Sequence, residues 1–238
     1  METVVCIPMS LEGQQEFIRQ VISVTDGTYL FAGLILMSVE DKVSIKCEIH
    51  PPDPNMAEAF EIGGQGTVST DEIAAIAAHR SVLYLIWDQP GLTELHRLHA
   101  FIKVCLKCGG LGVKFENSGV AHSYHSWEAM NFHENTLELM QAHVMLTGDE
   151  HYYYSTGMHV FGLPDTAVPV TIDNRQAGYL LTEFNHYQIF ESPEFKEGHT
   201  FSTSADAPYF RLREKTDWIN AGLECFENPY GRFLLEPV

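Results

Sequence analysis

The sequence is poor in basic residues. Lysine and arginine together number 14 against 32 aspartates and glutamates, which gives the 238-residue chain a formal net charge of −18. A surface this acidic repels nucleic-acid phosphate and anionic lipid over about a Debye length. The densest basic stretch, Arg211 to Lys215, has acidic residues interleaved. We therefore expect no nucleic-acid and no membrane partner, and charge favours a basic protein as the partner.

Long apolar runs are also lacking. No stretch approaches the roughly 18 apolar residues of a membrane-spanning helix. The opening residues, METVVCIPMSLEGQQ, have no basic segment and only a short apolar run, so they do not read as a signal peptide. The cysteines are odd in number and irregularly spaced, which favours a reducing, cytoplasmic compartment. They are Cys6, Cys47, Cys105, Cys108 and Cys225.

Compact catalytic motifs are missing too. The segment Gly63 to Gly66 precedes a helix start, where a phosphate cradle would lie, but it has no P-loop lysine. There is no Gly-x-Ser-x-Gly elbow and no His-Glu-x-x-His zinc helix. Glu183-x-x-His186 is a single copy of a motif that di-iron bundles use twice. We expect no cofactor.

One short stretch does carry metal-binding residue types. Cys105 and Cys108 form a Cys-x-x-Cys pair, which His122 and His125 follow at roughly the spacing of a zinc finger. Redox pairs lie at helix N-termini, where the dipole lowers the thiol pKa, but this pair lies at the C-terminal end of a helix predicted over 92–108. A step of about 100° per residue places Cys105 near the centre of the apolar arc. We interpret the pair as core, with a zinc site as the alternative.

The pattern of apolar residues predicts an α+β fold with a mixed or antiparallel sheet packed by amphipathic helices. Strands are expected at 4–8 and 43–50, and 28–39 reads as one buried central strand. Ser10 is expected to cap a helix over 11–24, and Ser69 with Glu72 forms a capping box. His96 and His99 fall on the polar side of the 92–108 helix. Further elements are predicted as helices at 71–79, 125–141 (interrupted near 131) and 173–190, and as strands at 81–88, 111–116, 143–148, 151–161, 168–172, 200–204, 209–214 and 231–238.

The chain is expected to form a single α+β unit over 1–238, with a weak seam near 135–142 that would separate two α/β sandwich modules. Asp173 is a suitable N-cap for the last long helix. The oligomeric state has no signal in the sequence.

Three segments in order, AHRSVLYLIW, GGLGVKFENSGVAHS and YYSTGMHVFGLPDTAVP, resemble a bacterial family known as domain of unknown function 4261. The resemblance covers roughly residues 70–238, and Met158 stands where that family has leucine, a volume-conserving change. The family is uncharacterised, so it implies no catalytic residues, and its pattern does not require Cys105 or Cys108. The matching positions are His79, Asn117, Gly119, His122, Ser123, Gly157, Gly162, Pro164 and Asp165.

These observations support two functional hypotheses. The first, which we favour, is a non-catalytic protein-interaction module with a basic partner. The second is a metal-assisted or acid/base hydrolase with a site around His122, helped by Asn117, His125 or Asp165. The hydrolase requires these side chains to converge on one cleft, whereas an interaction module requires a large exposed apolar or acidic surface.

Overall fold

The structure is a computed structural model that describes residues 2–238, apart from the side chains of Glu214 and Lys215. The chain forms two compact units, Glu2–Met130 and Asn131–Val238. The sequence-predicted seam near 135–142 lies a short way into the second unit. Both units combine helices with a mainly antiparallel sheet, so the α+β prediction is confirmed.

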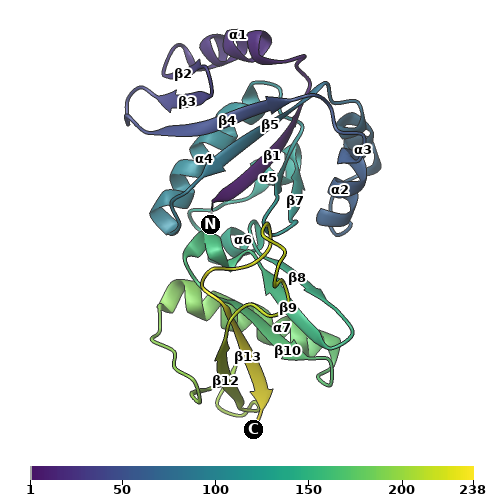
Figure 1. Ribbon diagram of the computed structural model, residues 1–238, viewed down its shortest axis with the longest axis vertical. Coiled ribbons are helices and arrows are strands. Elements are labelled where there is room, and N and C mark those ends of the chain that lie inside the picture. Colours follow the sequence, from purple (N-terminus) through teal and green to yellow (C-terminus); the bar gives the residue numbers. More distant parts are fainter. Residues whose placement is uncertain (1) are drawn as a thin grey trace. The chain divides into compact units, whose positions relative to one another are not determined.

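The first unit is built on one antiparallel sheet with the strand order β2-β3-β4-β5-β1-β6-β7 (Figure 1). Its central strands β1 and β5 pair along their full length and are almost entirely buried. Helices cover both faces of the sheet. The elements are β1 (Thr3–Met9), α1 (Gln14–Thr25), β2 (Tyr29–Ala32), β3 (Ile35–Ser38), β4 (Ser44–His50), α2 (Met56–Gly63), α3 (Thr70–Ala77), β5 (Ser81–Trp87), α4 (Leu92–Lys107), β6 (Gly112–Phe115), β7 (Ala121–Ser123) and α5 (Tyr124–Ala129).

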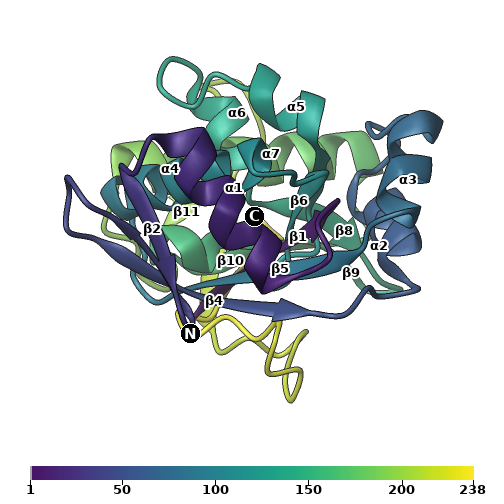
Figure 2. The ribbon, with the colours of Figure 1, turned by 90° about the horizontal axis from the view of Figure 1, so that it is seen from above.

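The two faces of this sheet receive different helices. The face that carries Cys6 packs against α2 and α3, through Phe60 and Ile76 among others. The opposite face packs against α1 and α4, because Phe17 of α1 meets Phe31 with ring centroids 5.0 Å apart and Phe101 of α4 meets Tyr29 at 5.7 Å. Figure 2 shows α1 lying along the β2 end of the sheet and α2 and α3 at the other end. The amphipathic 92–108 helix is confirmed as α4, except that His99, expected in solvent, is buried.

Residues 28–39 do not form the single central strand that their apolar run predicted. They form a hairpin, β2 and β3, at the edge of the sheet, with Phe31 opposite Leu36. The turn is Gly33-Leu34, and Gly33 has φ 64, a value that suits glycine at the first position of a two-residue hairpin turn. Burial then alternates along both strands, as expected of a sheet with one solvated face.

The expected cap of the first helix is also wrong. Helix α1 begins after Gly13, without a side-chain cap, and Ser10 instead donates a hydrogen bond from its hydroxyl to the carbonyl oxygen of Gly109. The capping box of α3 is confirmed. The Ser69 hydroxyl accepts from the amide of Glu72, whose carboxylate accepts from the Ser69 amide at 2.9 Å.

The second unit has a sheet of order β11-β12-β13-β10-β9-β8, in which β10 and β13 pair in parallel and the other neighbours are antiparallel. Asp173 caps the long helix α7 as predicted, by accepting from the amides of Arg175 and Gln176. The elements are α6 (Thr136–Gln141), β8 (Met145–Gly148), β9 (Tyr152–Thr156), a 3₁₀ turn (Met158–Phe161), β10 (Asp165–Pro169), α7 (Asn174–Glu191), β11 (Thr200–Phe201), β12 (Phe210–Lys215) and β13 (Arg232–Pro237).

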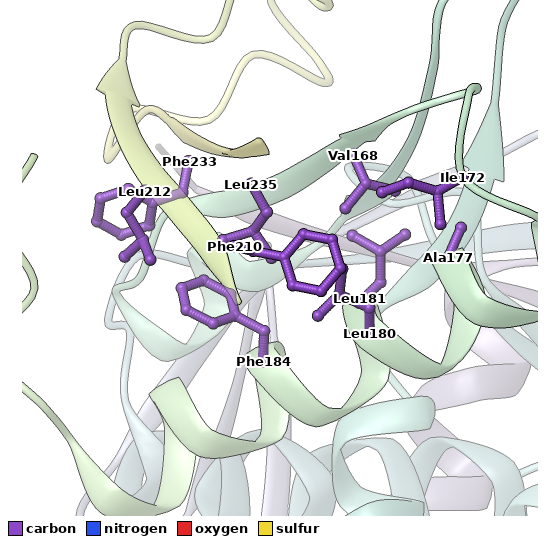
Figure 3. Close-up of a cluster of buried hydrophobic side chains, with 10 residues drawn as sticks. All are labelled: Val168, Ile172, Ala177, Leu180, Leu181, Phe184, Phe210, Leu212, Phe233 and Leu235. Atoms are coloured by element: carbon purple, nitrogen blue, oxygen red, sulfur yellow. The ribbon is translucent and has the colours of Figure 1, made fainter. Parts of the chain in front are cut away.

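Helix α7 covers one face of this sheet and forms the core of the unit (Figure 3). Phe184 is fully buried at the centre, with its ring 5.0 Å from Phe201 and 6.1 Å from Phe233. Leu180 and Leu181 extend the contact toward Val168 on β10. This apolar layer accounts for the position of α7 on the sheet, since its buried side chains follow the helical period.

Candidate functional site

The residues proposed for a hydrolase have different neighbours. Asn117 accepts a hydrogen bond on Oδ1 from the amide of Val4 at 2.7 Å, which fixes the start of β1. His122 lies buried on β7 with its ring 5.6 Å from that of Trp127. His125 is exposed on α5, with its ring edge-on to Tyr124. All three belong to the first unit. The hydrogen bond of Asn117 positions a strand, and the ring contact of His122 is a packing contact.

The sulfur pair of α4 lies in the interior. Cys105 is fully buried, and burial raises the pKa of its thiol well above the ordinary value. Cys108, expected at the edge of the apolar arc, is also buried, which raises its pKa to about 11. Over residues 2–238, no three histidine, cysteine or carboxylate side chains come together as a group that could hold a metal ion. Cys105, Cys108, His122 and His125 are thus not assembled as ligands.

Asp165 lies in the second unit, in a buried ionic cluster around Arg232. Asp217 accepts from Arg232 through both carboxylate oxygens, at 2.9 and 3.3 Å, and Asp165 lies 3.8 Å from the same guanidinium. Asn228 donates from its side-chain Nδ2 to Asp165 at 2.9 Å and from its backbone amide to Asp217 at 3.0 Å. A third Arg232 nitrogen donates to the carbonyl of Ser155 at 2.6 Å.

The two carboxyls of this cluster are tuned in opposite directions. Burial raises the pKa of Asp165 to about 6, although Arg232 acts to lower it. Asp217 is also desolvated, but its hydrogen bonds from Arg232 and from backbone amides outweigh that effect and lower its pKa overall. Asp165 and Arg232 are at most 1% exposed. A substrate has no access to them there, so the cluster ties β9, β10 and β13 together.

The most exposed apolar part of the first unit is the β2–β3 hairpin, which sequence reasoning placed in the core. Side chains at alternate positions of β2 and β3 point away from α1 and α4, because Leu30 pairs with Met37 and Ala32 with Ile35 on that face. Helices α2 and α3 pack at the β7 end of the same face, away from β2 and β3 (Figure 1). We call the following five residues the hairpin surface: Leu30, Leu34, Ile35, Met37 and Val39.

The hairpin surface is large for a group of side chains within ten positions. Its members are 37% to 57% exposed, and together they leave on the order of 400 Å² of apolar area in water, which is the size of the largest apolar patch on a typical monomer. Lys42 and Lys46 alternate with Glu40, Asp41 and Glu48 on the adjoining turn and on β4, which forms a charged border. A sequence signal for this exposure existed in Gly33, which breaks the apolar run.

A groove of about 440 Å³ opens at the tip of the hairpin, and we call it the tip groove. Phe31 and Ile49 provide apolar walls, Pro51 and Pro52 close one side, and the start of α1 at Gln14 lies on the other. Leu34 belongs both to the groove and to the hairpin surface. The ion pair of Glu12 with Arg80 forms the charged rim of the groove. The groove walls Phe31 and Ile49 lie on the α1 side of the sheet, opposite to Leu30, Ile35 and Met37, so the groove meets the hairpin surface only at Leu34.

No protein-family model matches this sequence, and no curated protein and no solved structure match it either. The resemblance to domain of unknown function 4261 therefore stays a prediction. Among residues 2–238, no helix has the length and apolar character needed to cross a membrane.

Proposed function

We propose that this protein is a non-catalytic interaction module whose partner docks on the hairpin surface. The observation that carries the proposal is the apolar area of Leu30, Leu34, Ile35, Met37 and Val39, which no helix of the described part of the unit covers. Burying an area of this size contributes up to about 10 kcal/mol, before the cost of bringing two molecules together. That contribution offsets much of the roughly 4–15 kcal/mol that association costs.

The charge of the chain supports a basic partner. Acidic residues outnumber basic ones in both units, and the net charge of −18 raises the association rate of a cationic protein while slowing that of another acidic one. A second copy of the same chain would bring another −18 to the complex. The five cysteines, among which no disulfide is present in residues 2–238, support a reducing compartment for both proteins.

Photo-crosslinking tests the proposal. A benzophenone amino acid in place of Leu34 should give one defined adduct in cells that express the protein, and the same amino acid in place of Ile62 should not. Ile62 is 67% exposed on α2 of the same unit, which makes it a matched control. The crosslinked partner is then purified and its Kd measured.

We expect Ile35→Glu to weaken that Kd by tenfold or more, because it places a charge in an apolar contact, and Ile62→Glu to leave it unchanged. Added salt should slow association with a basic partner. Equal binding by the two glutamate variants, or adducts from position 62 alone, would remove the hairpin surface as the docking site.

A further inference from the structure

Strand β4 is longer than the strand beside it. Five of its seven residues, Lys46 to His50, pair with β5, but β3 pairs only with Ser44 to Lys46. The hairpin turns back at Gly33-Leu34, so nothing in the described chain continues the line of β3 beyond that turn. The remainder of β4 therefore has a strand neighbour on one side only, and the tip groove lies on the other.

The backbone of Ile49 points into this gap. The amide of Cys47 donates to the carbonyl oxygen of Leu34 at 2.7 Å, on the β3 side. Amide and carbonyl directions alternate along a strand, so the amide and carbonyl of Ile49 point to the same side as those of Cys47. The partner that an unbroken β3 would place opposite Ile49 is Ala32, which instead pairs with Ile35 across the turn. Within the described chain, this donor and acceptor have no protein partner.

The side chains around the gap suit an inserted strand. Ile49 and Phe31 provide apolar contact for one side chain, and Leu34 lies beside it with 57% of its surface exposed. Residues before and after that side chain would point to the opposite face of the sheet, toward Ile35 and Glu48. Pro51 ends the strand and offers no amide, so the paired segment is short.

We propose that the tip groove binds a short extended segment of a basic partner protein, which pairs with β4 through the amide and carbonyl of Ile49. The inference rests on the proposed function and names how part of the partner is held. Backbone pairing of this kind supplies affinity, while alternate side-chain contacts supply specificity. The segment places one apolar residue over Phe31 and a lysine or arginine toward Glu48, where it would compete with Lys46, 2.8 Å from that carboxylate, and with His50 at 3.3 Å.

A second copy of the chain is a poorer occupant than a separate partner. The edge strand β2 is tied to α1 at both ends, because Gln14 donates to the carbonyl of Gly33 at 3.0 Å and the Thr25 hydroxyl accepts from the amide of Tyr29 at 3.3 Å. These bonds occupy outward-facing backbone groups at Tyr29 and Gly33, which leaves only a short part of that edge for pairing with another molecule. Like charge on two copies also opposes their association.

A phage library of random nine-residue peptides provides the probe. Selection on the full-length protein, with removal of phage that also bind the Leu34→Glu variant, should enrich peptides with a β-branched or aromatic residue next to lysine or arginine. An enriched peptide is then synthesised, and its Kd is measured by fluorescence polarisation. Self-association of the protein is checked by sedimentation.

The decisive comparison is Ile49→Pro against Ile49→Val. Proline removes the outward-pointing donor but no ladder bond to β5, and proline is tolerated where an amide faces away from the sheet. We expect Ile49→Pro to weaken peptide binding by tenfold or more and Ile49→Val to change it less than threefold. The peptide should also slow hydrogen exchange of the Ile49 amide, and N-methylation of one peptide amide should abolish binding while N-methylation of its neighbour does not.

The exchange and N-methylation results decide the question if Ile49→Pro does not fold. Unchanged exchange at Ile49 on saturation with peptide, equal binding by the two variants, failure to enrich any peptide, or a dimer that occupies the groove would each overturn strand pairing. The docking proposal is judged separately by Ile35→Glu, because Ile35 lies on the hairpin surface and does not line the groove. If partner binding depends on Ile35 but not on the Ile49 amide, docking on the hairpin surface is supported and strand pairing with β4 is refuted.

Discussion

Replacing Arg232 by methionine should destabilise the second unit strongly. The guanidinium is fully buried and is the cation for two buried carboxylates, Asp165 and Asp217. Removing one partner of a buried ionic cluster leaves charge without compensation, which costs about 3–5 kcal/mol of unfolding free energy. Methionine keeps much of the length of the arginine side chain and fills most of its space, so the lost unfolding free energy reports the missing charge more than a cavity.

The same variant should have a distinctive pH dependence. In the wild type, the pKa of Asp165 is raised to about 6 from an ordinary value of 3.8, so its contribution favours the folded state below pH 3.8 and is lost as the pH rises through about 6. Asp217 has a lowered pKa, so it stabilises the folded state at pH values above its ordinary pKa of 3.8, and this contribution is lost as the pH falls. Without Arg232 both pKa values rise. The loss of unfolding free energy caused by Arg232→Met should therefore be smaller at pH 5 than at pH 7.

Urea unfolding followed by tryptophan fluorescence measures these free energies. With phenylalanine in place of Trp87 and Trp127, Trp218 alone reports on the second unit, where its ring lies 5.7 Å from that of Tyr152. The matched control is Arg213→Met on the neighbouring strand. Arg213 pairs with Glu236 at 3.0 Å at the surface, so its loss should cost about 0–1 kcal/mol. A loss below about 1 kcal/mol for Arg232→Met, or one independent of pH, would refute this account of the cluster.

Two further predictions concern the interiors of the units. Phe184→Ala should lower the free energy of unfolding of the second unit by about 3–5 kcal/mol, as expected of a large buried ring, and Tyr179→Ala on the exposed side of the same helix should cost less than about 0.5 kcal/mol. Iodoacetamide should alkylate the exposed Cys225 in the native protein while Cys47 and Cys105 resist, since burial raises the pKa of Cys47 to about 12 and holds that of Cys105 well above its ordinary value. Peptide mass mapping that found Cys105 modified as fast as Cys225 would contradict that burial.

Local signals in the sequence were sufficient where the chemistry is local. Ser69 and Asp173 both cap helices as predicted, because a cap depends only on residues within one turn. The apolar period of 92–108 likewise defines α4. The prediction for 28–39 was wrong because a single glycine among many apolar residues is compatible with one long strand. In the structure Gly33 turns the chain.

Long-range partners were out of reach of the sequence. Arg232 appears as one basic residue near the start of a strand, and only folding brings it to Asp217 and Asp165. His99 projects on the polar side of its helix, yet Trp127 of a later helix covers it, with ring centroids 5.2 Å apart. The candidate site was missed for the same reason, since exposure of Leu30 and Met37 depends on which face of the sheet the helices leave open.

The parallel pair of β10 and β13 constrains how the protein is made. Strand β13 lies between β12 and β10 at the centre of its sheet, so the second unit cannot complete that sheet until residue 237 has left the ribosome. The first unit has all its strands by residue 123 and is free to fold while the rest is translated, as N-terminal domains generally do. During that interval β8, β9 and β10 are unfinished and their apolar face is without its final strands. The second unit therefore completes its apolar core only at the end of synthesis, because Phe233 and Leu235 of β13 belong to that core.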